Sequence, residues 1–228
     1  MEIRPDLSIC LVAEAAAVDA APCLQSLVAC ADPLALEVFV PATVTCGALQ
    51  SWPHLHEVEA EGLSTSAFID TVWRRARGRY LACWQSSVMA APGCLAALVH
   101  FLDEHPDVAV VGPRFLDGQG AIQATAFQRR LPWDSVVPGW DGLSSMEVDW
   151  LSGEALVVNS LALTDIELPT NNPGVWERRL CGRVRKQGWH NFFVHGARAV
   201  SRARLGRPLS VWHELLDDLR RRLPAARS

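Results

Sequence analysis

The segment "GRYLACWQSSVMAAPGCLAALVHFLDEHPDVAVVGPR", which runs from Gly78 to Arg114, contains the pattern that decides the fold. Tyr80–Trp84 and Val108–Val111 are short apolar runs of the kind that form buried strands. Between these runs, apolar residues recur at the three- and four-residue spacing of an amphipathic helix, namely Leu95, Leu98, Val99 and Leu102. A strand, a helix and a strand in this order predict a parallel βαβ unit.

The same alternation continues on both sides of this segment. It predicts strands at Leu7–Val12, Leu36–Val40 and Asn191–Val194, and helices at Val18–Ala31, Thr65–Arg77, Val175–Gln187 and Val211–Leu223. Val148–Asn159 is expected to form a strand pair or one strand bent at Gly153. Residues 114–147 are rich in Gly and Pro and are expected to form an excursion from the sheet. We therefore expect an α/β fold in which a parallel sheet carries helices on both faces.

Composition narrows the class of protein. Of 228 residues, 50% are hydrophobic and 20% are charged, which is typical of a globular protein. The sequence shows neither an apolar run of about 18 residues, as a membrane-spanning helix needs, nor a secretory leader, so we expect a cytoplasmic protein. The seven cysteines are an odd number without a C-x-x-C pair, which favours buried free thiols.

Charge is distributed unevenly along the chain. From Trp176 onward there are 13 Arg or Lys against 4 Asp or Glu, and arginine dominates. Arginine suits bidentate contact with phosphate, so this part could meet a nucleotide diphosphate or an anionic lipid head. The alternative is a solvated surface that pairs with the acidic N-terminal part. We predict no nucleic-acid partner.

Four segments in order resemble the family-2 glycosyltransferases of the GT-A fold, most closely their rhamnosyltransferase-like branch. They are "ARGRYLACW" (Ala76–Trp84), "PGCLAALVHFLDEHPDVAVVGPRFLDGQGAIQ" (Pro92–Gln123), "VDWLSGEALVVNSLAL" (Val148–Leu163) and "LCGRVRKQGW" (Leu180–Trp189). The resemblance covers about residues 6–200. It implies an α/β, GT-A-like (Rossmann-like) fold whose mixed, mainly parallel sheet carries helices on both faces. It also implies a nucleotide-sugar donor, an inverting transfer to an acceptor, and a divalent metal that holds the donor diphosphate.

The donor side departs from the family at four positions. The loop after the central strand has Ser87 where the resemblance implies a metal-binding aspartate, and Ser201 falls near the place of a late histidine. Pro41 or Ala42 stands where the second strand should end in an aspartate, and Glu14 is the polar residue after the first strand. Because a serine hydroxyl is a poor ligand for a hard cation, we expect no cofactor and regard a divalent metal as improbable.

The resemblance also assigns candidate catalytic and substrate-binding residues. Glu177 takes the place of the aspartate that removes the proton from the acceptor; the alternative is a surface glutamate in the first turn of a helix. The acceptor-side segment contributes Asp149, Trp150 and Gly153 as substrate-binding candidates. Arg179 and Arg183 share a helix face, because they are four residues apart, and could stabilise the leaving diphosphate in place of a metal. The alternative is an exposed basic face.

Two regions are expected, a GT-A-like domain at residues 1–205 and an amphipathic helical extension at residues 206–228. The extension could pack on its own domain, contact a protein partner, or lie on the inner face of a membrane. For function we expect a divergent glycosyltransferase-like protein, either metal-independent or inactive, that binds a nucleotide-sugar donor or a glycan acceptor. The alternative is a non-catalytic pseudo-glycosyltransferase that acts as a glycan- or protein-binding module.

Overall fold

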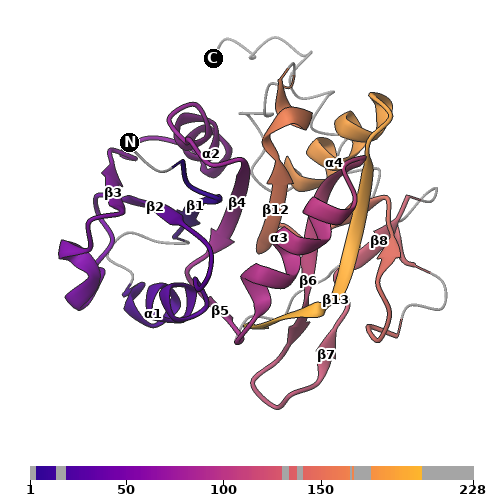
Figure 1. The fold of residues 1–228 in the computed structure, drawn as a ribbon, viewed down its shortest axis with the longest axis horizontal. Helices are drawn as coiled ribbons and strands as arrows, with labels where there is room; N and C mark the ends of the chain where they lie inside the picture. The colour runs from indigo at the N-terminus through magenta and orange to yellow at the C-terminus, as the bar shows by residue number, and fades with distance from the viewer. Residues whose placement is uncertain are drawn as a thin grey trace, which may run out of the picture.

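The computed structural model describes residues 4–13, 19–129, 134–137, 141–164, 166 and 176–201. Figure 1 shows β1 to β3 with α1 and α2 on one side of the molecule, and β6, β12, β13 and α4 on the other. Within the described part of the chain, no helix is both long enough and apolar enough to cross a bilayer.

One half of the main sheet is entirely parallel. Its strands are β1 (Leu7–Val12), β2 (Leu36–Pro41), β3 (Leu55–Val58) and β4 (Tyr80–Gln85). They lie in the order β3-β2-β1-β4, so β1 and β4, the first and last of the four along the chain, are neighbours in the sheet. The strands are buried and apolar on both faces, as parallel strands covered by helices are.

The other half of the sheet mixes parallel and antiparallel pairs. β12 (Ala155–Asn159) lies between β4 and β6 (Val108–Leu116) and is antiparallel to both, whereas β6 is parallel to β13 (His190–Ser201). The shorter strands at the margins of this sheet are β5 (Val88–Ala90), β7 (Ile122–Gln123) and β10 (Met146–Glu147). A separate small sheet joins β8 (Ala126–Gln128), β9 (Ser135–Val136) and β11 (Trp150–Leu151).

Helices cover both faces of the main sheet, as the alternating pattern predicts. One core cluster packs α1 (Ala21–Ala29) and α3 (Cys94–Glu104) against residues such as Ile9, and the other packs α2 (Thr65–Trp73) and α4 (Trp176–Lys186) against residues such as Cys10. Successive strand residues point to opposite faces of the sheet, so each strand contributes side chains to both clusters. Two short 3-10 helices complete the described elements, η1 (Gly47–Ser51) and η2 (Ser160–Leu163).

Several element boundaries differ from the sequence prediction: α1 is shorter than Val18–Ala31, and the segment Val148–Asn159 contains two strands, β11 and β12. Strand β6 continues past Pro113 to Leu116, into the region expected to be an excursion, because β13 pairs with it along almost its whole length. For the same reason β13 extends well beyond Asn191–Val194. Helix α2 ends at Trp73, before the predicted end at Arg77. The chain then approaches β1 closely: a Cβ added to Gly78 would lie 2.5 Å from Ser8 Oγ.

The seven cysteines are free and buried, as predicted. Burial raises the pKa of the Cys23 and Cys181 thiols to about 12, because an ionised thiolate loses its hydration in the core. These side chains therefore act as small core residues.

Candidate functional site

The candidate site lies at the edge of the sheet where β1 and β4 end and β12 begins. Val12 and Gln85 are partners in the parallel β1–β4 register, and Gln85 N donates to Glu154 O over 2.8 Å. Ser86 N donates to Val12 O, also over 2.8 Å. The loop after the central strand thus lies beside Glu154, at the edge where open α/β sheets bind ligands.

Helix α4 brings Glu177 to the same edge. The helix starts at Trp176. Glu177 packs closely on Gly153: a Cβ added to Gly153 would lie 3.1 Å from Glu177 Cδ and 3.2 Å from Glu177 Oε2. Glu177 as a residue is partly exposed, but its Oε2 is shielded from solvent and has no hydrogen-bond partner among the described residues. Gly153, predicted at the bend of the chain, therefore makes room for a carboxylate.

The environment of Glu177 shifts its titration into the neutral range. Burial raises the pKa of its carboxyl group from 4.5 to about 8, and the neighbouring Glu154 adds to the rise, while the N–H of Glu177 itself lowers it. Glu154 in turn accepts a hydrogen bond from Ser152 Oγ. A carboxyl group with a pKa near the working pH can exchange a proton with a bound molecule.

A cavity opens at the carboxyl ends of β1 and β2, next to the start of α2. Its volume is about 620 Å³, within the range of small-molecule sites. Val12, Pro41 and Phe68 supply apolar walls, and Glu61 and Thr65 supply polar ones. Pro41 stands where the resemblance implies an aspartate and supplies no carboxylate. The carboxylate in the lining is that of Glu61, on the loop after β3.

The fold brings together the two positions that the resemblance assigns to metal ligands. Ser201 is the register partner of Val88, the residue that follows Ser87. Ser87 Oγ is buried and has no hydrogen-bond partner among the described residues. Within the described ranges, no group of three or more His, Cys, Asp or Glu side chains is placed to hold a metal ion.

Two of the acceptor-side candidates are engaged in the architecture of the small sheet. Asp149 pairs with Arg185 and its Oδ2 accepts a hydrogen bond from Arg129 N over 2.7 Å. Trp150 is only 2% exposed, and its ring stacks on Phe127 with the centroids 4.2 Å apart. These contacts are those of packing residues, whereas the third candidate, Gly153, touches Glu177.

The structure does not bring Arg179 and Arg183 to Glu177. An α-helix turns by about 100° per residue, so Arg179 lies roughly 200° around α4 from Glu177. Arg183 is exposed and Arg179 half-buried, and the core side of α4 is formed by residues such as Cys181. The helical spacing placed the two arginines on one face correctly, but it is the face away from the candidate base.

Sequence reasoning missed Glu154, Ser152 and Glu61 as candidate functional residues. A signal for Glu154 exists, because it directly precedes the apolar run of β12 that pairs with the central strand. Several predictions lie outside the described residues: Glu14, the helix at residues 211–223 and the extension at residues 206–228.

No family model matches the chain, and no curated protein matches it. Among solved structures, the chain is similar to the crystal structure of GalNAc-T7 with UDP, GalNAc and Mn²⁺, at 12% sequence identity and a TM-score of 0.63. The match covers 91% of this chain but 46% of that one, so the chain spans less than half the length of this neighbour.

The neighbour corrects one sequence-based expectation. We expected no cofactor and a divalent metal to be improbable, and this is contradicted by the Mn²⁺ that GalNAc-T7 holds together with UDP. The expectation rested on protein positions alone, above all on Ser87 and Ser201, and left out ligands from the donor itself. Ions of this kind are held largely by substrate phosphates, with one or two protein carboxylates. The likeness itself shows the architecture: the chain has the GT-A glycosyltransferase fold, a mixed and mainly parallel sheet with helices on both faces.

Proposed function

We propose that the protein is a glycosyltransferase that moves a sugar from a nucleotide-sugar donor to an acceptor hydroxyl, with Glu177 as the catalytic base. The observation that carries this proposal is the Glu177 carboxyl group, which packs on Gly153 at the carboxyl edge of a GT-A sheet and has a pKa of about 8. A surface glutamate in a first helical turn would have no reason to titrate so high. The order of the four sequence segments supports the rhamnosyltransferase-like branch of family 2.

The reaction follows from the position of this group. The Glu177 carboxylate takes the proton of the acceptor hydroxyl while the hydroxyl oxygen forms a bond to the anomeric carbon of the donor. The bond between that carbon and the β-phosphate oxygen breaks, and the nucleoside diphosphate leaves with the electron pair. With a pKa of about 8, roughly a tenth of Glu177 is in the basic form at pH 7, so proton transfer is matched to near-neutral conditions.

The cavity at the ends of β1 and β2 is the proposed nucleoside site. Its volume of about 620 Å³ accommodates a base and a ribose. Phe68 and Pro41 offer apolar contact to the base, and the Glu61 carboxylate can accept hydrogen bonds from ribose hydroxyls or from a base N–H. β4 is the neighbour of β1 in the sheet, so the diphosphate would extend from this cavity toward Glu154 and Glu177.

Glu154 is the residue that fits a divalent cation in this arrangement. It is a carboxylate beside the loop after β4, and a hard cation accepts one such ligand together with diphosphate oxygens. When bound, the ion would neutralise charge on the leaving diphosphate. Ser87 and Ser201 meet at the same edge but contribute only neutral hydroxyls.

Calorimetric titration with UDP, GDP and dTDP, each with and without Mn²⁺, tests the donor site, and release of the nucleoside diphosphate from the matching sugar donors tests turnover. We expect one nucleotide to bind more tightly with Mn²⁺ than without it. Glu61→Gln should weaken the binding of that nucleotide about tenfold, because it removes a charge-assisted hydrogen bond. Glu59→Gln is the matched control, since Glu59 is an exposed carboxylate two residues away.

Two results would contradict the proposal in different ways. If none of the three nucleotides binds the folded protein, the donor site is wrong, and binding of a glycan array would then favour the non-catalytic module. If a nucleotide binds but Glu177→Gln leaves donor turnover unchanged, the base is wrong.

A further inference from the structure

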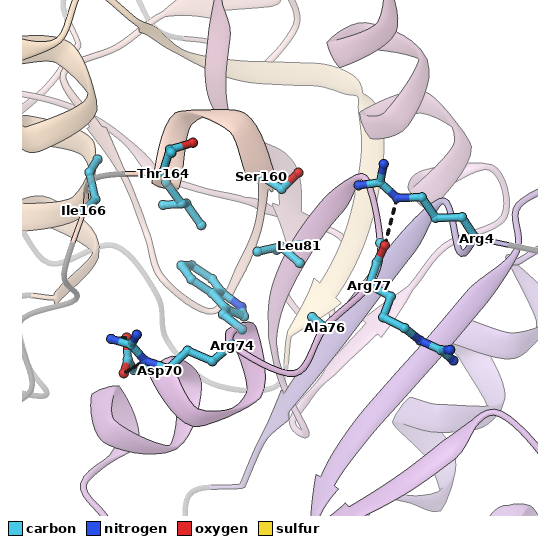
Figure 2. Close-up of a pocket in the computed structure, with 12 residues that line it drawn as sticks. Arg4, Asp70, Arg74, Ala76, Arg77, Leu81, Ser160, Thr164 and Ile166 are labelled. Atoms are coloured by element: carbon cyan, nitrogen blue, oxygen red, sulfur yellow. Dashed lines mark hydrogen bonds and ion pairs between the residues drawn. The ribbon is translucent and has the colours of Figure 1, made fainter.

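A second cavity lies at the opposite edge of the sheet from the candidate site. Its volume is about 680 Å³, and Gly78, Leu81 and Ser160 line it where β4 begins and β12 ends (Figure 2). Glu154 and Gln85 mark the other end of the same strand pair, since β12 and β4 are antiparallel. The length of these strands therefore separates this cavity from the proposed donor site.

Arg4, Arg74 and Arg77 line this cavity, and Arg77 Nε lies 3.6 Å from Glu37 Oε2. Among the described residues, Arg4 is the arginine of this lining with no recorded carboxylate partner. Its Nε donates to Arg77 O over 2.9 Å, which fixes the direction of the guanidinium group, and no partner for its two terminal nitrogens is recorded within the described residues. Arg74 also lines the cavity, but its Nε lies 2.8 Å from Asp70 Oδ2, so that charge is compensated. In Figure 2, Arg4 and Arg74 reach the cavity from different elements, with Leu81 and Ser160 between them in the view.

The remaining walls combine an apolar surface with hydroxyl groups. Trp73, Leu81 and Leu163 line the cavity, and the first two are largely buried. Ser160 Oγ donates to Arg79 O over 2.8 Å, and Thr164 Oγ1 donates to Leu161 O over 2.8 Å. Because each hydroxyl group uses its hydrogen in these bonds, its oxygen can still accept a hydrogen bond from a ligand. The lining thus offers the oriented guanidinium group of Arg4 beside two arginines that pair with carboxylates, an aromatic and aliphatic surface, and hydrogen-bond acceptors.

We propose that this cavity is a second ligand site, which binds a small organic anion: a carboxylate or phosphate head on Arg4 and an apolar body against Trp73. A guanidinium group with two open terminal nitrogens matches such a head in bidentate fashion. The apolar body is needed because a free phosphate would leave the Trp73 and Leu81 surface uncovered. The site is independent of the proposed donor site.

The test uses phenyl phosphate as the probe, with inorganic phosphate and benzyl alcohol as head-only and body-only arms. We expect phenyl phosphate to bind the full chain in calorimetric titration at least tenfold more tightly than either fragment. A saturating nucleotide should leave this affinity unchanged, because the two cavities lie at opposite edges of the sheet.

Two pairs of variants locate the binding. Arg4→Gln should weaken phenyl phosphate about tenfold, whereas Arg75→Gln should not, since Arg75 is an exposed arginine outside the lining. Thr164→Glu, which adds a repelling carboxylate to the wall, should weaken it as well. Leu161→Glu, on the short helix that ends just before Thr164 but outside the lining, should not. Circular dichroism of each variant verifies that it is folded.

The proposal is overturned if phenyl phosphate does not bind, or if a nucleotide displaces it, which would place it in the donor site. It is also overturned if Arg4→Gln and Arg75→Gln behave alike in folded protein. A carboxylate probe, phenylacetate, tests whether the site accepts both kinds of head. With either probe, weaker binding in Arg4→Gln but not in Arg75→Gln would support the site.

Discussion

Gly153 and Glu177 are in direct contact: a Cβ on Gly153 would lie 3.1 Å from Glu177 Cδ and 3.2 Å from both its Oε2 and the Cζ2 atom of Trp176. These two residues lie on different elements, the turn before β12 and the first turn of α4. The absence of a side chain at Gly153 is what allows the carboxyl group to pack against the backbone, where burial raises its pKa.

Gly153→Ala should therefore displace Glu177. We expect the added methyl group to crowd the carboxylate and to lower the free energy of unfolding by about 1–3 kcal/mol, the usual cost of overpacking. Urea unfolding measures the stability, and donor turnover measures the loss of the base position. Gly118→Ala is the control, because nothing lies within 4 Å of its Cβ position. Equal turnover in both variants would contradict the prediction.

Glu177→Gln should change how stability depends on pH. The folded-state pKa of about 8 lies above the ordinary value of 4.5, so the folded protein holds the proton more tightly than the unfolded chain does. This contribution is complete below about pH 4.5 and is lost as the pH rises toward 8. At about 1.36 kcal/mol per pKa unit it amounts to a few kcal/mol.

Urea unfolding of the wild type and of Glu177→Gln at pH 5, 7 and 9 measures this contribution. The wild type should lose stability relative to the variant across the series. A constant difference between the two proteins would show that the carboxyl group titrates in its usual range.

Glu154→Gln should lower the pKa of Glu177, because it removes a negative charge that disfavours ionisation of that carboxyl group. The carboxyl carbon resonance of Glu177, followed by NMR in ¹³C-glutamate-labelled protein without metal, reports this directly. Glu147→Gln is the comparison, since Glu147 is exposed and pairs with Arg185 and His190. A shift of the same size in both variants would mean that Glu154 is not the responsible neighbour.

Ser87→Asp should strengthen Mn²⁺ binding in the presence of nucleotide. A carboxylate is a far better ligand for a hard cation than a hydroxyl group, and we expect the affinity to rise about tenfold or more. Ser87→Asn, nearly identical in shape but neutral, is the control. Calorimetric titration of Mn²⁺ into the UDP complex measures the effect, and identical affinities for the two variants would contradict a metal site at this edge.

Asp134→Ala should destabilise the start of α4. Arg178 and Asp134 form a pair whose side chains are 4% and 0% exposed, so removal of one partner leaves a buried charge. We expect a loss of about 3–5 kcal/mol in the free energy of unfolding. Asp70→Ala removes the partner of the exposed Arg74 and should cost less than about 1 kcal/mol. Losses of similar size would contradict the buried character of the first pair.

Most of the main sheet and its helices could be predicted from the sequence. The apolar runs of Tyr80–Trp84 and Val108–Val111, with the amphipathic helix between them, predicted the strands and the helix that the structure contains, and free cysteines were expected in the core. These predictions succeeded because hydrophobic periodicity is a local property: a period of two or 3.6 residues decides the secondary structure and which face is buried. Boundaries such as the end of β13 were missed, because pairing with β6 extends the strand beyond its apolar run.

The arrangement of the candidate site depends on tertiary packing. The spacing of Arg179 and Arg183 correctly put them on one helix face, but which face meets the sheet depends on how α4 packs. Trp150 turned inward onto Phe127. Glu177 acquired its high pKa from burial, where it packs on Gly153, and Glu154 adds to the rise. Burial and electrostatic fields arise from groups that are distant in sequence and close in space, so no local pattern encodes them.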